Sequence, residues 1–265
     1  MNKIFTTLLM MLMCCTVFAY PVEIDGIYYN LDASTKEAEV TRKPNAYGYY
    51  KGSIVIPEKV SFGESVYNVT TIGIEAFTHN GNLISISIPN SITSIGNKAF
   101  MGLSGLSEIS IPNSVNNLGD SAFYSCSNLV KVTLPSYMDS IGACAFGACT
   151  KLSSITIPNG IKCIGKHTFF FTNITSVRIP NTVTIIEDEA FSGCTYLESI
   201  DIPNSVISIG KFTFSNCKSL TSITFPNSVR SIGSGAFDYC TSLSSIICLS
   251  LTPPANLFSL ETRIN

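Results

Sequence analysis

The sequence predicts a solenoid, a rod of about eight stacked coils built mainly from short strands. Two residue types repeat with one period along the chain. Prolines recur at Pro57, Pro89, Pro112, Pro135, Pro158, Pro180, Pro203 and Pro226, and phenylalanines at Phe77, Phe100, Phe123, Phe146, Phe169, Phe191, Phe214 and Phe237. After the first proline interval, both series advance by 22 or 23 residues at each step. A fixed period of this length predicts stacked units, because each unit can bury its apolar face only against its neighbours.

The first 19 residues have the pattern of a secretion signal. A basic start at Met1–Lys3 precedes an uncharged apolar stretch over residues 4–19, which is shorter than the roughly 20 residues of a membrane-spanning helix. Val17 and Ala19 stand at the positions of a small-residue cleavage site, so we expect cleavage after Ala19. No later segment is long and apolar enough to span a bilayer. The mature chain is therefore expected to be exported, either secreted or on the cell surface.

Residues 20–52 are predicted to form a small β cap at the N-terminal end. Two extended segments flank a turn at Asp25–Gly26, and a terminal coil needs such a cover because its core face would otherwise meet water. The extra residues between Pro57 and Pro89, around 62–65, predict a hairpin inserted in the first coil. The repeats run from 53 to 248, and residues 249–265 form a C-terminal tail.

Residues 106–129, LSEISIPNSVNNLGDSAFYSCSNL, represent one repeat. The alternation L-x-x-I-x-I predicts a half-buried strand, and Pro–Asn is expected to end it in a turn. A second extended piece ends at Gly119, whose missing side chain is expected to permit a tight bend. Phe123 then turns inward. If successive coils stack about 4.8 Å apart, the phenylalanines form one continuous aromatic column.

The phrases SITSIGNKAFMGLSGLSEISIP, SVISIGKFTFSNCKSLTSITFP and SVRSIGSGAFDYCTSLSSI resemble the BspA-like leucine-rich repeat family. The resemblance covers about Ser53 to Cys248, with small departures such as Leu103 and Thr172 at positions where the pattern has Cys. It implies a right-handed leucine-rich-repeat solenoid of the α/β horseshoe class, rich in strands and with few regular helices. Members are associated with adhesion, so it also implies a protein or glycan partner on host or microbial surfaces. The resemblance identifies no particular ligand.

The composition excludes several classes of function. Charged residues make up 13% of the chain and the formal net charge is -2, whereas an electrostatic nucleic-acid binder needs clustered Lys and Arg. Trp is absent and only two histidines are present. The sequence contains no nucleophile elbow, zinc-protease motif, P-loop or dinucleotide fingerprint. It therefore predicts no enzyme, no catalytic residue, no cofactor and no metal site.

Five cysteines share one repeat position, three residues after the column phenylalanine: Cys126, Cys149, Cys194, Cys217 and Cys240. Their spacing excludes a C-x-x-C zinc site. In a stacked column their Cα atoms would lie within disulfide range, but their Cβ vectors would be parallel and poorly placed for a bridge. A buried ladder of small apolar side chains is the favoured interpretation, with disulfides or a metal as the alternative.

The solvent-facing positions of the strand motif are rich in Ser and Thr and carry few charges. We expect this face to be the contact surface, with charged positions at Glu108, Lys131, Arg178, Glu198 and Asp201. Arg178, Glu198 and Asp201 are predicted to lie at its centre. The mixture of signs suits a protein or glycan better than nucleic acid or an anionic membrane. The alternative is that these residues are solvated strand residues of a passive structural spacer, or of a fragment of a larger surface array, with no ligand of its own.

Phe170 and Phe171 form a second, less favoured candidate site. They follow the column residue Phe169 in a coil that is one residue short. An exposed aromatic pair can anchor a partner. The alternative, which we favour, is that the shorter loop folds both rings back over the gap left by the missing residue.

Overall fold

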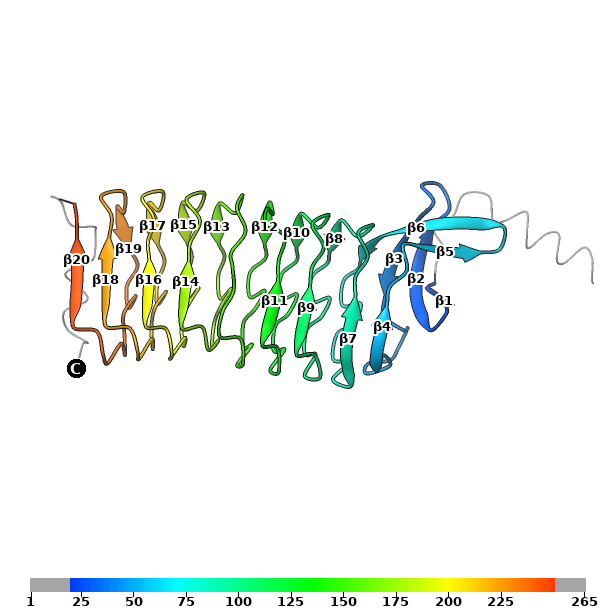
Figure 1. The fold of residues 1–265 in the computed structure, drawn as a ribbon, viewed down its shortest axis with the longest axis horizontal. Coiled ribbons are helices and arrows are strands. Elements are labelled where there is room, and N and C mark those ends of the chain that lie inside the picture. The colour runs from blue at the N-terminus through cyan, green and yellow to red at the C-terminus, as the bar shows by residue number, and fades with distance from the viewer. Residues whose placement is uncertain (1–19, 251–265) are drawn as a thin grey trace, which may run out of the picture.

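The computed structural model describes residues 20–250 as a rod of about eight strand-bearing turns, and it confirms the predicted solenoid (Figure 1). No residue in this range is helical, in line with the expected scarcity of regular helices. The predicted signal at residues 1–19 and most of the tail, residues 251–265, lie outside the described residues. Each coil takes the name of its repeat phenylalanine, from the Phe77 coil to the Phe237 coil.

Two rows of parallel strands run the length of the rod. The first row carries the L-x-x-I-x-I motif and consists of β4 (Gly52–Val55), β7 (Leu83–Ser87), β9 (Glu108–Ser110), β11 (Lys131–Thr133), β14 (Ser176–Arg178), β16 (Ser199–Asp201), β18 (Ser222–Phe225) and β20 (Ser245–Cys248). The second row consists of β8 (Ser94–Ile95), β10 (Asn117–Leu118), β12 (Ser140–Ile141), β13 (Cys163–Ile164), β15 (Ile185–Ile186), β17 (Ser208–Ile209) and β19 (Ser231–Ile232). Paired strands align equivalent residues, as with Ser176 opposite Ser199.

The cap extends the second row toward the N-terminus. Strand β1 (Val22–Ile24) forms a hairpin with β2 (Ile27–Asp32), which pairs with β3 (Glu37–Thr41). Strand β3 lies parallel to β6 (Ser65–Ile72), and β6 lies parallel to β8. Strand β5 (Lys59–Phe62) turns back into β6 with Phe62 opposite Ser65. This is the hairpin predicted for the first coil, and it extends beyond the rod in Figure 1.

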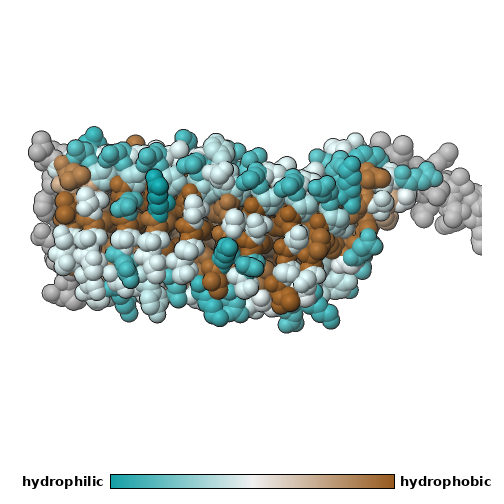
Figure 2. All heavy atoms as spheres, viewed as in Figure 1, coloured by the Kyte–Doolittle hydropathy of each residue, from teal (hydrophilic) through white to brown (hydrophobic). Residues whose placement is uncertain are grey.

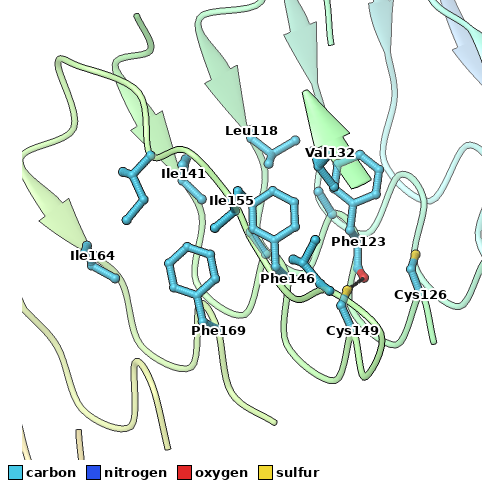
Figure 3. Packing of buried hydrophobic residues seen from close by; sticks show 14 of the residues in the cluster. Leu118, Phe123, Cys126, Val132, Ile141, Phe146, Cys149, Ile155, Ile164 and Phe169 are labelled. Carbon is cyan, nitrogen blue, oxygen red and sulfur yellow. Dashed lines mark hydrogen bonds between the residues drawn. The ribbon is translucent and has the colours of Figure 1, made fainter. Parts of the chain in front are cut away.

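The eight repeat phenylalanines form the predicted aromatic column. Neighbouring rings are stacked, with centroids 4.9–5.9 Å apart, and all eight side chains are buried. Figure 3 shows Phe123, Phe146 and Phe169 in succession. Tyr50 of the cap covers the N-terminal end, with its ring centroid 4.9 Å from that of Phe77. Each buried ring contributes about 1.5–3 kcal/mol, so the column is a main source of stability.

The backbone is left-handed at fixed positions around each column phenylalanine. The residues two before and two after it have positive φ, as at Ser121 (55°) and Ser125 (59°) on either side of Phe123. Six of the eight repeat prolines are followed by asparagine, and none of these asparagines has a positive φ. Gly119 has no positive φ either; a Cβ there would lie less than 3 Å from the backbone of the preceding coil. Glycine is thus needed for the close approach of two coils and not for a bend.

Candidate functional site

The outward face of the first row carries all five charged residues predicted for the contact surface. Glu108, Lys131, Arg178, Glu198 and Asp201 are exposed. Lys131 lies opposite Glu108 and Arg178 opposite Asp201 in the strand register. The ion pairs of residues 20–250 lie elsewhere, at Arg42–Glu75, Lys98–Glu75 and His167–Glu189. These five charges are therefore presented to solvent without an ionic partner in the described part of the chain.

Figure 2 shows that this side of the rod is pale in part, with a brown band along its length and teal groups mainly above that band. The pale part follows from the composition of the first row, since its outward positions are mainly Ser and Thr. A face of hydroxyl groups offers many hydrogen-bond donors and acceptors at low charge density. The few charged side chains on this face are therefore isolated points of charge among neutral hydroxyl groups.

The first row consists of separate parallel pairs, β4–β7, β9–β11, β14–β16 and β18–β20, and in the middle of the rod one coil contributes no strand to it. Residues 153–158 form no strand, although Leu152, Ile155 and Ile157 keep the repeat pattern and are buried. Strand β11 pairs only with β9, and β14 pairs only with β16. The Thr175 amide donates to the Ser153 carbonyl at 3.1 Å. The backbone groups of residues 154–157 make no hydrogen bond within residues 20–250.

The second row is interrupted at the boundary between the Phe146 and Phe169 coils. Strands β12 and β13 are not paired, although in the preceding coil the Gly142 amide donates to the Leu118 carbonyl at 2.8 Å. A Cβ on Gly165 would lie 3.5 Å from the nearest atom of the preceding coil, the Cα of Ala143. A Cβ on Gly142 would lie less than 3 Å from the backbone of the coil before it. The two coils are therefore spread apart on this side.

The turns around the column phenylalanines still join these two coils. The Phe146 amide donates to the Thr168 carbonyl at 3.0 Å, and the Cys144 amide donates to the Lys166 carbonyl at 2.8 Å. Two more backbone hydrogen bonds cross this boundary at the proline turn: the Met138 amide donates to the Asn159 carbonyl and the Asn159 amide to the Ser136 carbonyl, both at 3.0 Å. In the described residues, the two strand rows contribute no backbone hydrogen bond there.

The cysteine ladder is buried, and it also changes at this boundary. The thiols of Cys126, Cys149, Cys194, Cys217 and Cys240 each donate to the carbonyl of the phenylalanine in the preceding coil, at 3.0–3.3 Å. Figure 3 shows the bond from Cys149 to Phe123. In the Phe169 coil Thr172 takes the cysteine position, and its hydroxyl donates to Phe169 within the same coil at 2.9 Å. The sequence predicted the burial of this ladder but not its hydrogen bonds.

A groove of about 820 Å³ lies over the interrupted part of the first row. Lys131 on β11 and Arg178 on β14 line it from its two sides. Hydroxyl side chains and apolar side chains share most of the rest of the lining: Thr133, Ser136, Ser154, Thr156 and Ser176 on the one hand, and Val132, Leu134, Pro135, Ile155, Ile157 and Pro158 on the other. The other predicted contact residues do not line this groove. Asp201 lines a separate hollow of about 310 Å³ together with Asn204 and Thr224. The structure thus joins Lys131 and Arg178 in one site and leaves Glu108 and Glu198 on the surrounding face.

Phe170 and Phe171 pack against each other, with centroids 4.4 Å apart and their planes at 90°. Phe171 also lies against Gly193 of the next coil, where a Cβ would be 2.9 Å from its ring. The same arrangement joins Tyr124 to Gly147. Phe171 keeps 46% of its surface exposed. Its role as an anchor stays a prediction.

Within residues 20–250, no three His, Cys, Asp or Glu side chains are grouped in a way that would hold a metal ion. In the same range, no helix has the length and apolarity needed to cross a membrane. His167 is half-buried, and its Nε2 lies 3.1 Å from a carboxylate oxygen of Glu189.

Parallel strands on successive coils, a stacked phenylalanine column and an exposed hydroxyl-rich strand face define a leucine-rich repeat solenoid protein. The model of the BspA type leucine rich repeat region matches residues 70–196 and 162–258, with six copies of the repeat. The chain belongs to this family. The family and its fold are generally non-enzymatic binding scaffolds.

Solved structures of other leucine-rich repeat proteins are similar to this chain. A leucine rich cell surface protein from Faecalibacterium prausnitzii is 26% identical, with a TM-score of 0.60 over 86% of this chain and 76% of that one. The leucine-rich repeat protein of T. pallidum is 23% identical, with a TM-score of 0.46 over 86% and 82%. No protein of curated function matches the chain.

Proposed function

We propose that this chain is a secreted or cell-surface binding module, which presents the first-row face to a protein or glycan on host or microbial surfaces. The observation that carries the proposal is the groove at the interrupted strand row, where Lys131 and Arg178 are exposed and unpaired within the described residues. The likeness to a solved cell surface protein supports the location. The proposed export signal, residues 1–19, lies outside the described residues.

The proposed role is non-enzymatic and needs no cofactor. The support is that none of the motifs expected of a hydrolase, kinase or dehydrogenase occurs in the sequence. In the described range, the buried titratable side chains are mostly thiols, and burial raises the pKa of Cys126 to about 12. A protonated thiol is a poor nucleophile at neutral pH.

The first test is direct binding. The mature chain, residues 20–265, is immobilised and exposed to purified host matrix proteins, epithelial surface glycans and microbial surface extracts. Saturable binding to one purified component supports the proposal. Failure to bind any of them favours the alternative, a passive spacer or part of a larger surface array.

The second test locates the surface. We propose Arg178, Glu198 and Asp201 as the centre of the contact, and the triple change to Ser is expected to weaken binding while the unfolding midpoint stays nearly constant. The matched control replaces Arg230, Glu64 and Asp139 by Ser, which removes the same charges from exposed positions elsewhere. If affinity survives the first triple change, the centre of the strand face is not the site.

A further inference from the structure

We propose that the groove between β11 and β14 binds a carboxylated oligosaccharide. The inference rests on the proposed function and names the class of ligand for that face. It depends on three features of the groove: two cations without an ionic partner in the described chain, hydroxyl groups among the lining residues, and backbone groups that have no partner in the described chain.

The two cations are Lys131 and Arg178, which stand on opposite sides of the groove. Two coil steps separate β11 from β14. Each step is about 4.8 Å where strands are hydrogen-bonded and is wider where they are not, so the strands that carry the two cations are at least about 10 Å apart along the rod. An arginine side chain holds a carboxylate through two parallel hydrogen bonds, and a lysine ammonium adds a point charge. A linear ligand with carboxylates on successive units can reach both cations at once, whereas a ligand with a single carboxylate reaches one.

Between the cations the groove offers polar groups of the kind that bind sugar hydroxyls. Thr133, Ser154, Thr156 and Ser176 contribute side-chain hydroxyls, and each can both donate and accept. The backbone of residues 154–157 adds amides and carbonyls that are not used in any strand pairing. In the free protein such groups bind water, and a sugar hydroxyl can replace that water with equivalent hydrogen bonds.

The same features argue against other occupants. A peptide strand would need an open edge beside β11 or β14, but residues 154–157 line the groove between these two strands. Nucleic acid would need many more cations than two, and the net charge of the chain is -2.

The test is titration of the mature chain with defined sugars at low salt. Trigalacturonate and α2,8-disialyllactose each carry more than one carboxylate and are titrated separately, so that they distinguish a uronate from a sialic acid source. Binding is expected for at least one of them. The galacturonate monomer has one carboxylate, and the fully methyl-esterified trimer has none. Both are expected to bind at least about tenfold more weakly than the trimer.

The variant Lys131→Ser/Arg178→Ser is expected to lose at least about tenfold in affinity for the sugar that binds. The matched control Lys218→Ser/Arg230→Ser removes two exposed cations away from the groove and should change affinity less than about twofold. Unfolding midpoints of both variants show whether the fold is intact. Equal losses in the two variants would mean that binding follows net charge alone, and would overturn the inference.

Two further outcomes would overturn it. The first is that neither carboxylated sugar binds; if the chain still binds a surface protein, the proposed function survives and only the ligand class is wrong. The second is that a tetraglutamate peptide, which carries carboxylates without sugar hydroxyls, binds as tightly as the sugar.

Discussion

Tyr137 lies against Gly160 of the next coil, where a Cβ would be 2.7 Å from the tyrosine ring. Both residues stand at the second position after the repeat proline. Five other coils carry Ser or Thr there. Ser114 and Thr182 donate from it to the carbonyls of Ile92 and Ile161 in the preceding coil at 2.6 and 2.8 Å, whereas the hydroxyls of Ser91, Ser205 and Ser228 are buried without a partner in residues 20–250. The pair therefore places a ring over a glycine where those coils have a small hydroxyl side chain, at the boundary where the strand rows are interrupted.

We expect Gly160→Ser to destabilise the protein by about 1–3 kcal/mol, because Gly160 has a φ of +97° and its Cβ would meet both the Met138 carbonyl oxygen and the Tyr137 ring. In a Tyr137→Ser background the same change should cost at least about 0.5 kcal/mol less, since the contact with the ring is removed while the contact with the Met138 carbonyl stays. Urea unfolding of both single variants and the double variant measures this coupling. The same cost in both backgrounds would contradict it.

Phe146→Ala is expected to cost about 3–5 kcal/mol, because it opens a cavity between two stacked rings. Phe237→Ala should cost less. Phe237 stacks on Phe214 alone, and its other ring contact is the tilted Phe225. Denaturant unfolding compares the two variants, and equal losses would argue against the column as the shared source of stability.

Amide hydrogen exchange is expected to be locally fast in the middle of the rod. The amides of Ser154, Ile155 and Gly165 have no acceptor among the described residues, whereas those of Gly119 and Gly142 donate to the preceding coil at 2.9 and 2.8 Å. Exchange at the first group should be about tenfold faster or more. Mass spectrometry of peptic fragments resolves these segments. Uniform protection along the rod would show that the rows are continuous in solution.

Stability should fall at alkaline pH because of the cysteine ladder. Burial raises the pKa of Cys194 and of Cys240 to about 11, from an ordinary value of 9.0. Above pH 9 the unfolded chain loses thiol protons that the folded chain keeps. The ladder's contribution is thus complete below pH 9 and is lost as pH rises toward 11.

Thermal unfolding between pH 8 and 11, with a reductant present, measures this decline. The unfolding midpoint of Cys194→Ala should fall less steeply with rising pH, because the variant lacks one of the thiols whose pKa is raised by burial. Cys248→Ala is the control: Cys248 is only partly buried, so its removal should change the slope less. Identical slopes for the protein and Cys194→Ala would exclude the ladder as the cause.

Much of this fold can be predicted from the sequence, because the proline and phenylalanine periods determine which residues stack. The interruption at residues 153–158 could not be predicted in this way, since Leu152, Ile155 and Ile157 keep both the spacing and the burial of the repeat. Its visible signal is Tyr137 with Gly160, one substitution in each of two successive repeats, whose effect depends on contact between coils. The left-handed positions have no signal, because residues as different as Glu75, Lys98 and Cys144 occupy them.

The interrupted rows also determine how this rod would respond to mechanical load. A pull along its axis acts on every coil boundary in series, so the boundary with the fewest hydrogen bonds yields first. Among the described residues that is the junction of the Phe146 and Phe169 coils, where neither strand row contributes a backbone hydrogen bond. The two halves would part there while each keeps its own packed core. Under shear the protein would therefore lengthen at one defined place, and the groove beside Lys131 and Arg178 would widen with it.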